Sequence, residues 1–433
     1  MEHKNFGATS LGASPSVRAG EWSAGWRTLL GGFLAMSTAW NVVSISLSVF
    51  LKPMQATFGW SRTELSIAPL ASLLTAFLFP VTGLLLDRFG ARKVAIAGTA
   101  AMGGALALFA VVPLNPTIFA ALIVLLALAG AAINSFVLSR GVASIFQKNL
   151  GSALGILLSG VSVALAVLVP AISSRVAMYG WQAGFAALSA LALLFSLPVL
   201  VLLFREPKHT TIGDTAITHR GRDTFAVLFA QLSFWRLAGA CFIASIPIGG
   251  AINHLVPLLS DRGLSGGNVA SLASVFAIAI GVGGLVNGAL FDRLHAPLVT
   301  AVTLALSAIG SGLLYALPAR PDTLGGLALA VALIGLATGT EGDYITYFSN
   351  RLFGLRNFAR VVSVMALTIS VGMALGGLFF SAIYDHWGNY GPAVIASIGL
   401  YIAAAVTFLS ISMPPRASQN SPLNPLSGTE SGV

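Results

Sequence analysis

The sequence predicts an all-α membrane protein with twelve transmembrane helices in two pseudo-symmetric six-helix bundles. Three observations lead to this prediction. Apolar residues make up 56% of the 433 residues and charged residues only 9%, whereas a soluble domain carries about 25% charged residues. The apolar residues are gathered in runs of the length that a bilayer requires, about 20 residues for each helix. Finally, the stretch Gly83-Leu-Leu-Leu-Asp-Arg recurs in the second half of the chain as Gly288-Ala-Leu-Phe-Asp-Arg.

Twelve apolar runs are long enough to cross a bilayer once each. Glycines and prolines inside them are compatible with spanning helices, because neighbouring helices re-satisfy the backbone groups that these residues free. An even number of spans places both ends of the chain on the same side of the membrane. We place the spans at 27–50, 66–86, 94–112, 117–138, 152–173, 183–203, 235–257, 269–290, 298–317, 324–346, 361–383 and 392–412.

The orientation follows from the basic residues of the loops. Of the 23 Lys and Arg residues, 18 fall on the side that holds both termini and 5 on the opposite side. Loops rich in Lys and Arg stay in the cytoplasm. We therefore expect a multi-pass protein of the bacterial inner membrane with both termini cytoplasmic and the lipid bilayer as its surroundings.

Polar stretches divide the chain into five segments. The longest internal one, 204–234, is expected to be a cytoplasmic linker between the two bundles. The last segment is rich in Ser, Pro, Asn and Gly, which favours disorder. The segments are a cytoplasmic N-terminal tail at 1–25, a six-helix bundle at 26–203, the linker at 204–234, a six-helix bundle at 235–413 and a disordered cytoplasmic tail at 414–433.

Several classes of function are disfavoured by the composition. The net charge of +9 comes from the loops, and no basic cluster with interleaved aromatic residues accompanies it, so we expect no nucleic-acid partner. The single Cys241 rules out an internal disulfide. The sequence contains no phosphate-binding loop, metal-ligand spacing or nucleophile–base arrangement. We therefore expect no cofactor, no metal and no enzymatic activity.

The repeated motif resembles a known signature. Gly83, Asp87-Arg88, Gly90 and Arg92-Lys93 are similar to the residues between helices two and three of the major facilitator superfamily, and the resemblance extends over almost the whole chain. Three further stretches resemble bacterial relatives of monocarboxylate transporters and oxalate–formate antiporters. These stretches are Phe58–Leu65, Gly339–Asp343 continued by Arg351–Arg356, and Tyr384–Tyr390.

The resemblance implies a secondary active transporter that works by alternating access. Its solute would be small and organic, a monocarboxylate or related anion, moved together with a proton by a monomer. Two departures concern anion binding. Ile45 stands where monocarboxylate carriers have a lysine, and Gly281–Gly288 contains no arginine. The alternatives are proton-driven efflux of drugs or metabolites and a membrane sensor that does not transport.

The repeated motif also supplies the gating candidates. A glycine lets two helices approach closely, and an aspartate at a helix end can meet the positive N-terminus of another helix. The resemblance implies that Asp87 meets helix eleven and latches the outward-facing state. The basic residues would pair with acids or lipid phosphates, or would only fix the topology. The candidates are Gly83, Asp87, Arg88, Gly90, Arg92 and Lys93, with Asp292 and Arg293 in the repeat.

Two acidic residues lie within a predicted span, Glu341 and Asp343. An acid in the membrane is costly unless it is paired or lines a wet cavity, so both are functional candidates. At 100° per residue they lie about 200° apart on the helix and cannot face one cavity. Glu341 is a candidate for binding proton or solute, or for a structural ion pair. For Asp343 we favour a gate that pairs with Arg293, Arg351 or Arg356.

Other polar residues lie on helices one, four, seven and ten, which in this superfamily line the central cavity. An asparagine can orient a polar solute, but it can equally form an interhelical hydrogen bond. His254 titrates near neutral pH or sits at the membrane interface. Arg140 attracts an anionic solute or extends to the lipid headgroups. The proton or solute candidates are therefore Asn41, Asn134, Asn253, His254 and Arg140, together with Glu341.

Overall fold

The computed structural model describes residues 20–59, 67–206 and 225–414. All regular elements in these ranges are helical. Most of the two terminal tails, the middle of the predicted linker and most of the Phe58–Leu65 stretch lie outside the described residues.

The first six spans run from α1 to α10. Span one combines three short helices, and span four combines two. The elements are α1 (Glu21–Ala35), a 3-10 turn (Met36–Thr38), α2 (Trp40–Ser46) and α3 (Ser48–Phe58) for span one, α5 (Ile67–Phe89) for span two, α6 (Ala91–Val111) for span three, α7 (Pro116–Ala132) and α8 (Ser135–Ala143) for span four, and α9 (Leu150–Ala190), a π-helical turn (Leu191–Ser196) and α10 (Leu197–Leu202) for spans five and six.

The last six spans run from α12 to α16. A short helix, α11 (Phe225–Phe229), precedes them, so the described end of the predicted linker is helical. The spans are α12 (Leu232–Asp261), α13 (Gly266–Arg293) and α14 (Ala296–Ala316) for seven to nine, α15 (Leu324–Trp387) for ten and eleven, and α16 (Gly391–Leu409) for twelve.

Two glycines divide the longest helices into separate spans. Ten helical stretches in the described ranges are long and apolar enough to cross a membrane. Two of them, which contain α9 and α15, are interrupted by Gly180 (φ 84°) and Gly354 (φ 71°). A positive φ is strained for any residue with a Cβ atom. Each part is long enough to span a bilayer, so the described residues contain twelve spans, and the predicted all-α membrane fold is confirmed.

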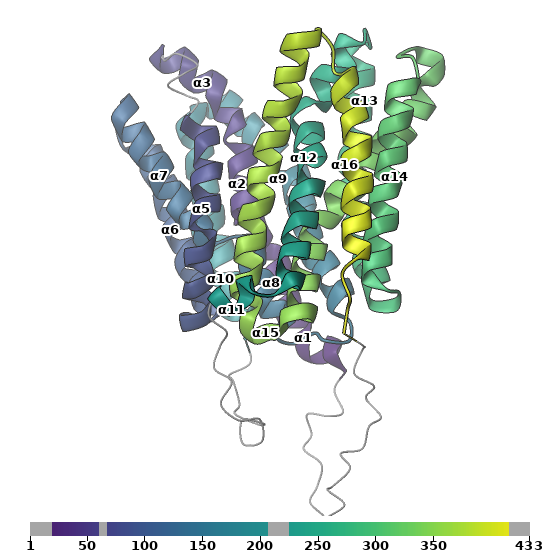
Figure 1. The fold of residues 1–433 in the computed structure, drawn as a ribbon. Helices are drawn as coiled ribbons and strands as arrows, with labels where there is room; N and C mark the ends of the chain where they lie inside the picture. The colour runs from purple at the N-terminus through teal and green to yellow at the C-terminus, as the bar shows by residue number, and fades with distance from the viewer. Residues whose placement is uncertain (1–19, 60–66, 207–224, 415–433) are drawn as a thin grey trace, which may run out of the picture.

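The spans form one bundle in which the ends of the described chain lie together. α1 begins and α16 ends at the lower end of the bundle in Figure 1, which we call the terminal face. The opposite end, the far face, is broader in this view. The two halves meet where α9 packs against α13 and where α5 packs against α15. These two contacts position the candidate site.

Candidate functional site

Asp87 lies between two arginines from different parts of the chain. Its Oδ1 accepts a hydrogen bond of 3.1 Å from Arg140 Nη1 on α8, and its Oδ2 one of 2.9 Å from Arg360 Nε on span eleven. The side chains of Asp87 and Arg140 are only 4% and 6% exposed, and that of Arg360 is 16% exposed. A carboxylate that accepts from two guanidinium groups forms strong, charge-assisted hydrogen bonds. Asp87 therefore ties spans two, four and eleven together.

The end of span six extends this cluster of charges. Glu206 Oε1 lies 4.0 Å from Arg140 Nε, and its Oε2 accepts from the backbone N–H of Arg92 at 3.4 Å. Arg92 also donates to the carbonyl of Val201 at 2.7 Å. Gly90 has a φ of 81° and faces the Glu206 carboxylate. The turn between spans two and three is thus fixed to span six within the first half.

Gly83 allows spans two and eleven to cross closely. A Cβ atom added at Gly83 would lie 2.6 Å from Ser363 Oγ and 2.8 Å from the carbonyl oxygen of Ala359. Both distances are too short for any larger residue. The crossing lies one turn from Asp87 along α5, so the close packing and the ion pair form one contact between the halves.

Spans five and eight form the second contact through glycines on both sides. A Cβ atom at Gly155 would lie 2.8 Å from the carbonyl oxygen of Gly284. One turn nearer the terminal face, Gly151 and Gly288 face each other's carbonyl oxygens even more closely. Small residues of this kind let membrane helices approach until their backbones touch.

Asp292, the counterpart of Asp87 in the repeat, binds the N-terminus of α9. Its Oδ1 accepts from the N–H of Gly151 at 2.7 Å, and its Oδ2 accepts from the N–H and the hydroxyl group of Ser152, both at 2.7 Å. These N–H groups belong to the first turn of a helix, where they have no partner within the helix. The carboxylate also interacts favourably with the helix dipole. Each half thus contributes one motif aspartate to a contact with the other half, and both contacts lie at the terminal face.

The two acids of span ten face different helices. Glu341 is 8% exposed and accepts a hydrogen bond of 2.9 Å from Ser245 on α12. Asp343 is fully buried, and its carboxylate lies against Gly284 of α13. The expected pairs with Arg293, Arg351 or Arg356 are not formed by either acid within the described ranges. The approximately opposite orientation agrees with the helical spacing of the two positions.

Spans one and four are both interrupted inside the membrane. Ala39 has extended backbone angles (φ −63°, ψ 151°), as does Asn134 (φ −124°, ψ 164°). The interruptions are joined, because the N–H of Trp40 donates to the carbonyl of Ile133 at 2.9 Å. Non-helical backbone is tolerated at this depth only where it is buried in protein or lines a cavity.

The two asparagines beside these interruptions differ in exposure. Asn134 is buried and caps α8 by accepting from the N–H of Ser135 at 2.6 Å. Asn41 follows the interruption of span one and is exposed, as is Ile45 one turn later. The two candidates therefore lie on neighbouring elements, and Asn41 is the exposed one of the two.

The candidates on span seven belong to the second half. Asn253 is exposed and donates to the carbonyl of Gly249 in its own helix at 2.7 Å. His254 is partly buried against span eleven, with Nε2 at 3.0 Å from the carbonyl of Gly377 and Nδ1 at 3.3 Å from the hydroxyl group of Tyr390. These contacts fit a histidine that joins spans seven and eleven.

The remaining gating candidates are on the surface of the terminal face. Arg88, Lys93 and Arg293 are exposed, and Arg88 lies over the ring of Phe89 at 5.3 Å. Arg140, for which we considered attraction of a solute or extension to the headgroups, does neither in this conformation. It is 5% exposed and engaged by Asp87.

Three residues of these contacts were not among the sequence candidates. Arg360 lies one residue before the predicted span eleven, 361–383, so the sequence places it in a loop. Ser245 is one of many hydroxyl residues in apolar runs, and Glu206 falls in the predicted linker. One signal in the sequence points to Arg360. It is an arginine next to span eleven, and span eleven is the helix that Asp87 is expected to meet.

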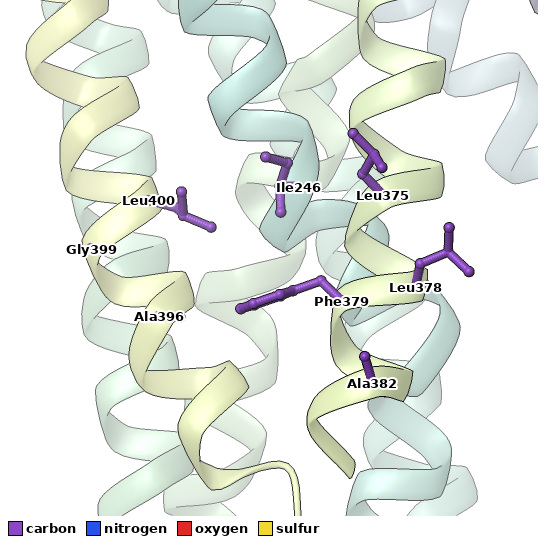
Figure 2. A pocket seen from close by; sticks show the side chains of 8 residues that line it. All are labelled: Ile246, Leu375, Leu378, Phe379, Ala382, Ala396, Gly399 and Leu400. Carbon is purple, nitrogen blue, oxygen red and sulfur yellow. The ribbon is translucent and has the colours of Figure 1, made fainter. Parts of the chain in front are cut away.

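A cavity of about 690 Å³ lies away from these polar residues. Spans seven, eleven and twelve surround it, and Figure 2 shows that the side chains that line it carry no polar atoms. Leu378, at its edge, is 67% exposed. The lining consists of Ile246, Leu375, Leu378, Phe379, Ala382, Ala396, Gly399 and Leu400. A purely apolar groove with an open side fits contact with lipid and offers no group that would recognise a polar solute.

Known proteins are similar to this chain in sequence. A family model described as Major Facilitator Superfamily matches residues 28–341 and 237–430. Monocarboxylate transporter 11 of Homo sapiens is 25% identical over 441 residues, which cover 96% of this chain and 88% of that protein. A chloramphenicol resistance protein of Streptomyces lividans is 29% identical over 290 residues, which cover 66% of this chain and 71% of that protein.

A solved structure agrees with the fold. The fucose:proton symporter of E. coli superimposes with a TM-score of 0.69 at 15% sequence identity, over 91% of this chain and 100% of that one. The chain belongs to the Major Facilitator Superfamily. It is a multi-pass membrane transporter related to the monocarboxylate transporters, and not an enzyme.

Proposed function

We propose that this transporter moves a small organic anion of the monocarboxylate class together with a proton, by alternating access of the two halves. The observation that carries this proposal is the pair of aspartate contacts that joins the halves at the terminal face. The name of the human relative, which is aligned over 96% of this chain, supports the class of solute.

The contacts support a conformation that is closed at the terminal face. Gly83 and Asp87 lie near the end of span two, and Gly151 and Asp292 lie at the ends of spans five and eight. A carrier that alternates must break such contacts to release its solute on that side and re-form them afterwards. In our proposal the terminal face is cytoplasmic, which agrees with the excess of Lys and Arg there, and the conformation is outward-facing.

The solute-binding region that we propose lies beside the interruptions of spans one and four. The N-terminus of α8 carries the positive end of a helix dipole, and interrupted membrane helices in other carriers direct such ends at anionic groups of the solute. Asn41 and Asn134 supply amide groups there. In our proposal, the helix terminus and the two amide groups attract the carboxylate of the solute. They take the role of the lysine of monocarboxylate carriers, whose position is occupied by Ile45 in this chain.

Uptake into proteoliposomes tests the proposal. Purified protein is reconstituted, and entry of labelled monocarboxylates is compared with that of dicarboxylates and neutral sugars, with and without an imposed proton gradient. We expect gradient-driven accumulation of at least one monocarboxylate, inhibited by its analogues. Accumulation of a sugar alone, or uptake of the anion that ignores the proton gradient, would contradict the solute class or the coupling, respectively.

A second candidate is proton-driven export of a drug, favoured by the relative that confers chloramphenicol resistance. Expression of this chain in a drug-sensitive bacterial strain distinguishes the two. Export predicts a raised inhibitory concentration of chloramphenicol, which the Asp87→Asn variant fails to give. Monocarboxylate uptake predicts an unchanged inhibitory concentration and growth on the transported acid.

A further inference from the structure

Asp343 is a buried acid that the proposed transport cycle leaves unused. Its side chain is fully buried, and neither carboxylate oxygen has a hydrogen-bond partner in the described part of the chain. It lies eleven residues before Gly354 in span ten, which is about 16 Å of helix from that turn. The acid is therefore inside the membrane and away from the headgroups.

The seam between α13 and α15 that holds Asp343 is covered by span five. A Cβ atom at Gly284 of α13 would lie 3.3 Å from Asp343 Oδ2, so the carboxylate faces a residue without a side chain. Span five covers the same seam, with Gly155 against Gly284 and with Leu158 at 3.0 Å from a Cβ atom added at Gly342. Span five belongs to the other half, so this cover exists only while the terminal face is closed.

Neighbouring polar groups in the seam are satisfied, which sets Asp343 apart. The amide of Asn287 donates to Thr340 at 2.8 Å and accepts from Thr303 at 2.7 Å. The described charged residues and histidines on the helices packed here are Asp292 and Arg293 on α13, Arg140 on α8, Asp87 and Arg88 on α5, Arg175 on α9, Arg236, His254 and Asp261 on α12, and Glu341, Arg351, Arg356, Arg360, Asp385 and His386 on α15 itself. None of these forms an ion pair with Asp343.

An ionised carboxylate without partners is strongly disfavoured in a dry interior, whereas the neutral acid is tolerated. We propose that closing the terminal face takes up one proton at Asp343, and that opening it hydrates the seam and releases this proton. Asp343 is then a proton-binding group whose occupancy is linked to the conformation of the carrier. The linkage is independent of which solute is transported, so it goes beyond the function proposed above and is tested without a solute.

The sign of the effect follows from the linkage. Because the closed state holds one more proton, lowering the pH favours closure, and raising the pH favours opening. Over the range in which the hydrated acid is ionised, the ratio of closed to open protein changes by about tenfold for each pH unit. Replacing Asp343 with a neutral residue of the same shape removes this dependence and leaves the closed state favoured at all pH values.

A buried cysteine at the contact between spans two and eleven can report whether the terminal face is closed. Ser363 is fully buried opposite Gly83, so a cysteine there reacts with a maleimide only when the terminal face opens. In a Cys241→Ala background, the labelling rate of Ser363→Cys is measured in detergent between pH 5 and pH 9, values chosen to bracket neutrality. The rate at each pH is divided by the rate for the same protein unfolded in denaturant, because the reactive thiolate itself becomes more abundant as the pH rises. We expect this relative rate to rise steeply with pH, and we expect it to stay low throughout in Asp343→Asn. Asp261→Asn, which removes an exposed acid at the end of α12, is the control, and it should keep the pH dependence.

Two outcomes would overturn the proposal. One is a labelling rate of the Ser363→Cys protein, relative to the unfolded protein at the same pH, that does not vary with pH. The other is a pH dependence that survives in Asp343→Asn. If Asp343→Asn does not fold, infrared spectroscopy of the chain with Asp343 intact provides the test. At alkaline pH, its spectrum should contain the carbonyl band of a protonated carboxylic acid. The Gly155→Leu substitution pushes span five away from the seam, so this band should be lost in that variant. An identical band in both proteins, or none in either, would equally reject the assignment.

Discussion

Asp292 and Ser152 lie in opposite halves of the chain. One carboxylate oxygen of Asp292 accepts two hydrogen bonds of 2.7 Å, from the backbone N–H and from the hydroxyl group of Ser152. The equivalent Asp87 binds two arginine side chains instead. The two copies of one motif therefore close the same face by different chemistry. One uses a helix terminus and the other uses buried ion pairs, and the consequences of removing them differ.

Replacing Asp87 with asparagine should cripple transport while membrane insertion stays normal. The change removes the negative charge that Asp87 places between Arg140 and Arg360, and breaking a buried pair in this way costs about 3–5 kcal/mol. The closed state loses this energy, so the Ser363→Cys reporter should label much faster in this variant. Arg88→Gln, which alters an exposed neighbour, is the control for transport and labelling. Normal uptake by Asp87→Asn would refute the latch.

Replacing Asp292 with alanine should have a smaller effect than replacing Asp87. Loss of a helix cap costs about 1 kcal/mol, which corresponds to about a fivefold change in the closed population. Because the two aspartates share no partner, their effects on the free energy of closure should add. The measurement is reporter labelling in the single and double variants. A double variant no worse than Asp87→Asn alone would show that the contacts do not act independently.

The glycines of spans five and eight provide a test of close packing. Gly155→Ala adds a Cβ atom 2.8 Å from the carbonyl oxygen of Gly284, whereas Gly281→Ala adds one whose nearest neighbour is Ser162 at 3.7 Å. Both positions lie at the same helix pair. We therefore expect Gly155→Ala to favour the open terminal face and to slow transport, and Gly281→Ala to leave both unchanged. Equal effects of the two substitutions would argue against backbone contact as the cause.

Glu341 should be required for proton-driven uptake but not for exchange. Glu341→Gln keeps an acceptor for the Ser245 hydroxyl group, so the packing between spans seven and ten survives while the ionisable group is lost. Accumulation driven by a proton gradient should fall to background, and counterflow of labelled solute should persist. Ser245→Ala, which keeps the carboxyl group, should retain gradient-driven uptake. Unchanged coupling in Glu341→Gln would exclude it from the proton pathway.

The sequence was sufficient for the fold because the membrane imposes a strong constraint on span length. The apolar runs and the repeated motif led to the all-α membrane fold and to the superfamily, and both are confirmed. Span one is longer than predicted, because Glu21 holds its first turn by accepting from the N–H groups of Gln147, Lys148 and Asn149. This contact joins residues far apart in the chain, which hydropathy alone cannot detect.

The site was less predictable because its contacts depend on the packing of the two halves. The sequence marked Asp87 and span eleven but not Arg360, whose role depends on which face of that helix meets span two. It placed Glu341 and Asp343 on opposite faces, yet the expected arginine partners are not used in the described structure. Burial of an acid against a glycine can be recognised only when the neighbouring helix is seen.

The hydrogen bond from Trp40 to Ile133 joins spans one and four through the main chain alone. Only a proline at position 40 would remove this donor; every other side chain leaves it in place. Substitutions in spans one and four can therefore change the side chains that meet a solute without removing the backbone hydrogen bond between the two spans. The connection between the two spans is thus independent of the side chains that determine selectivity.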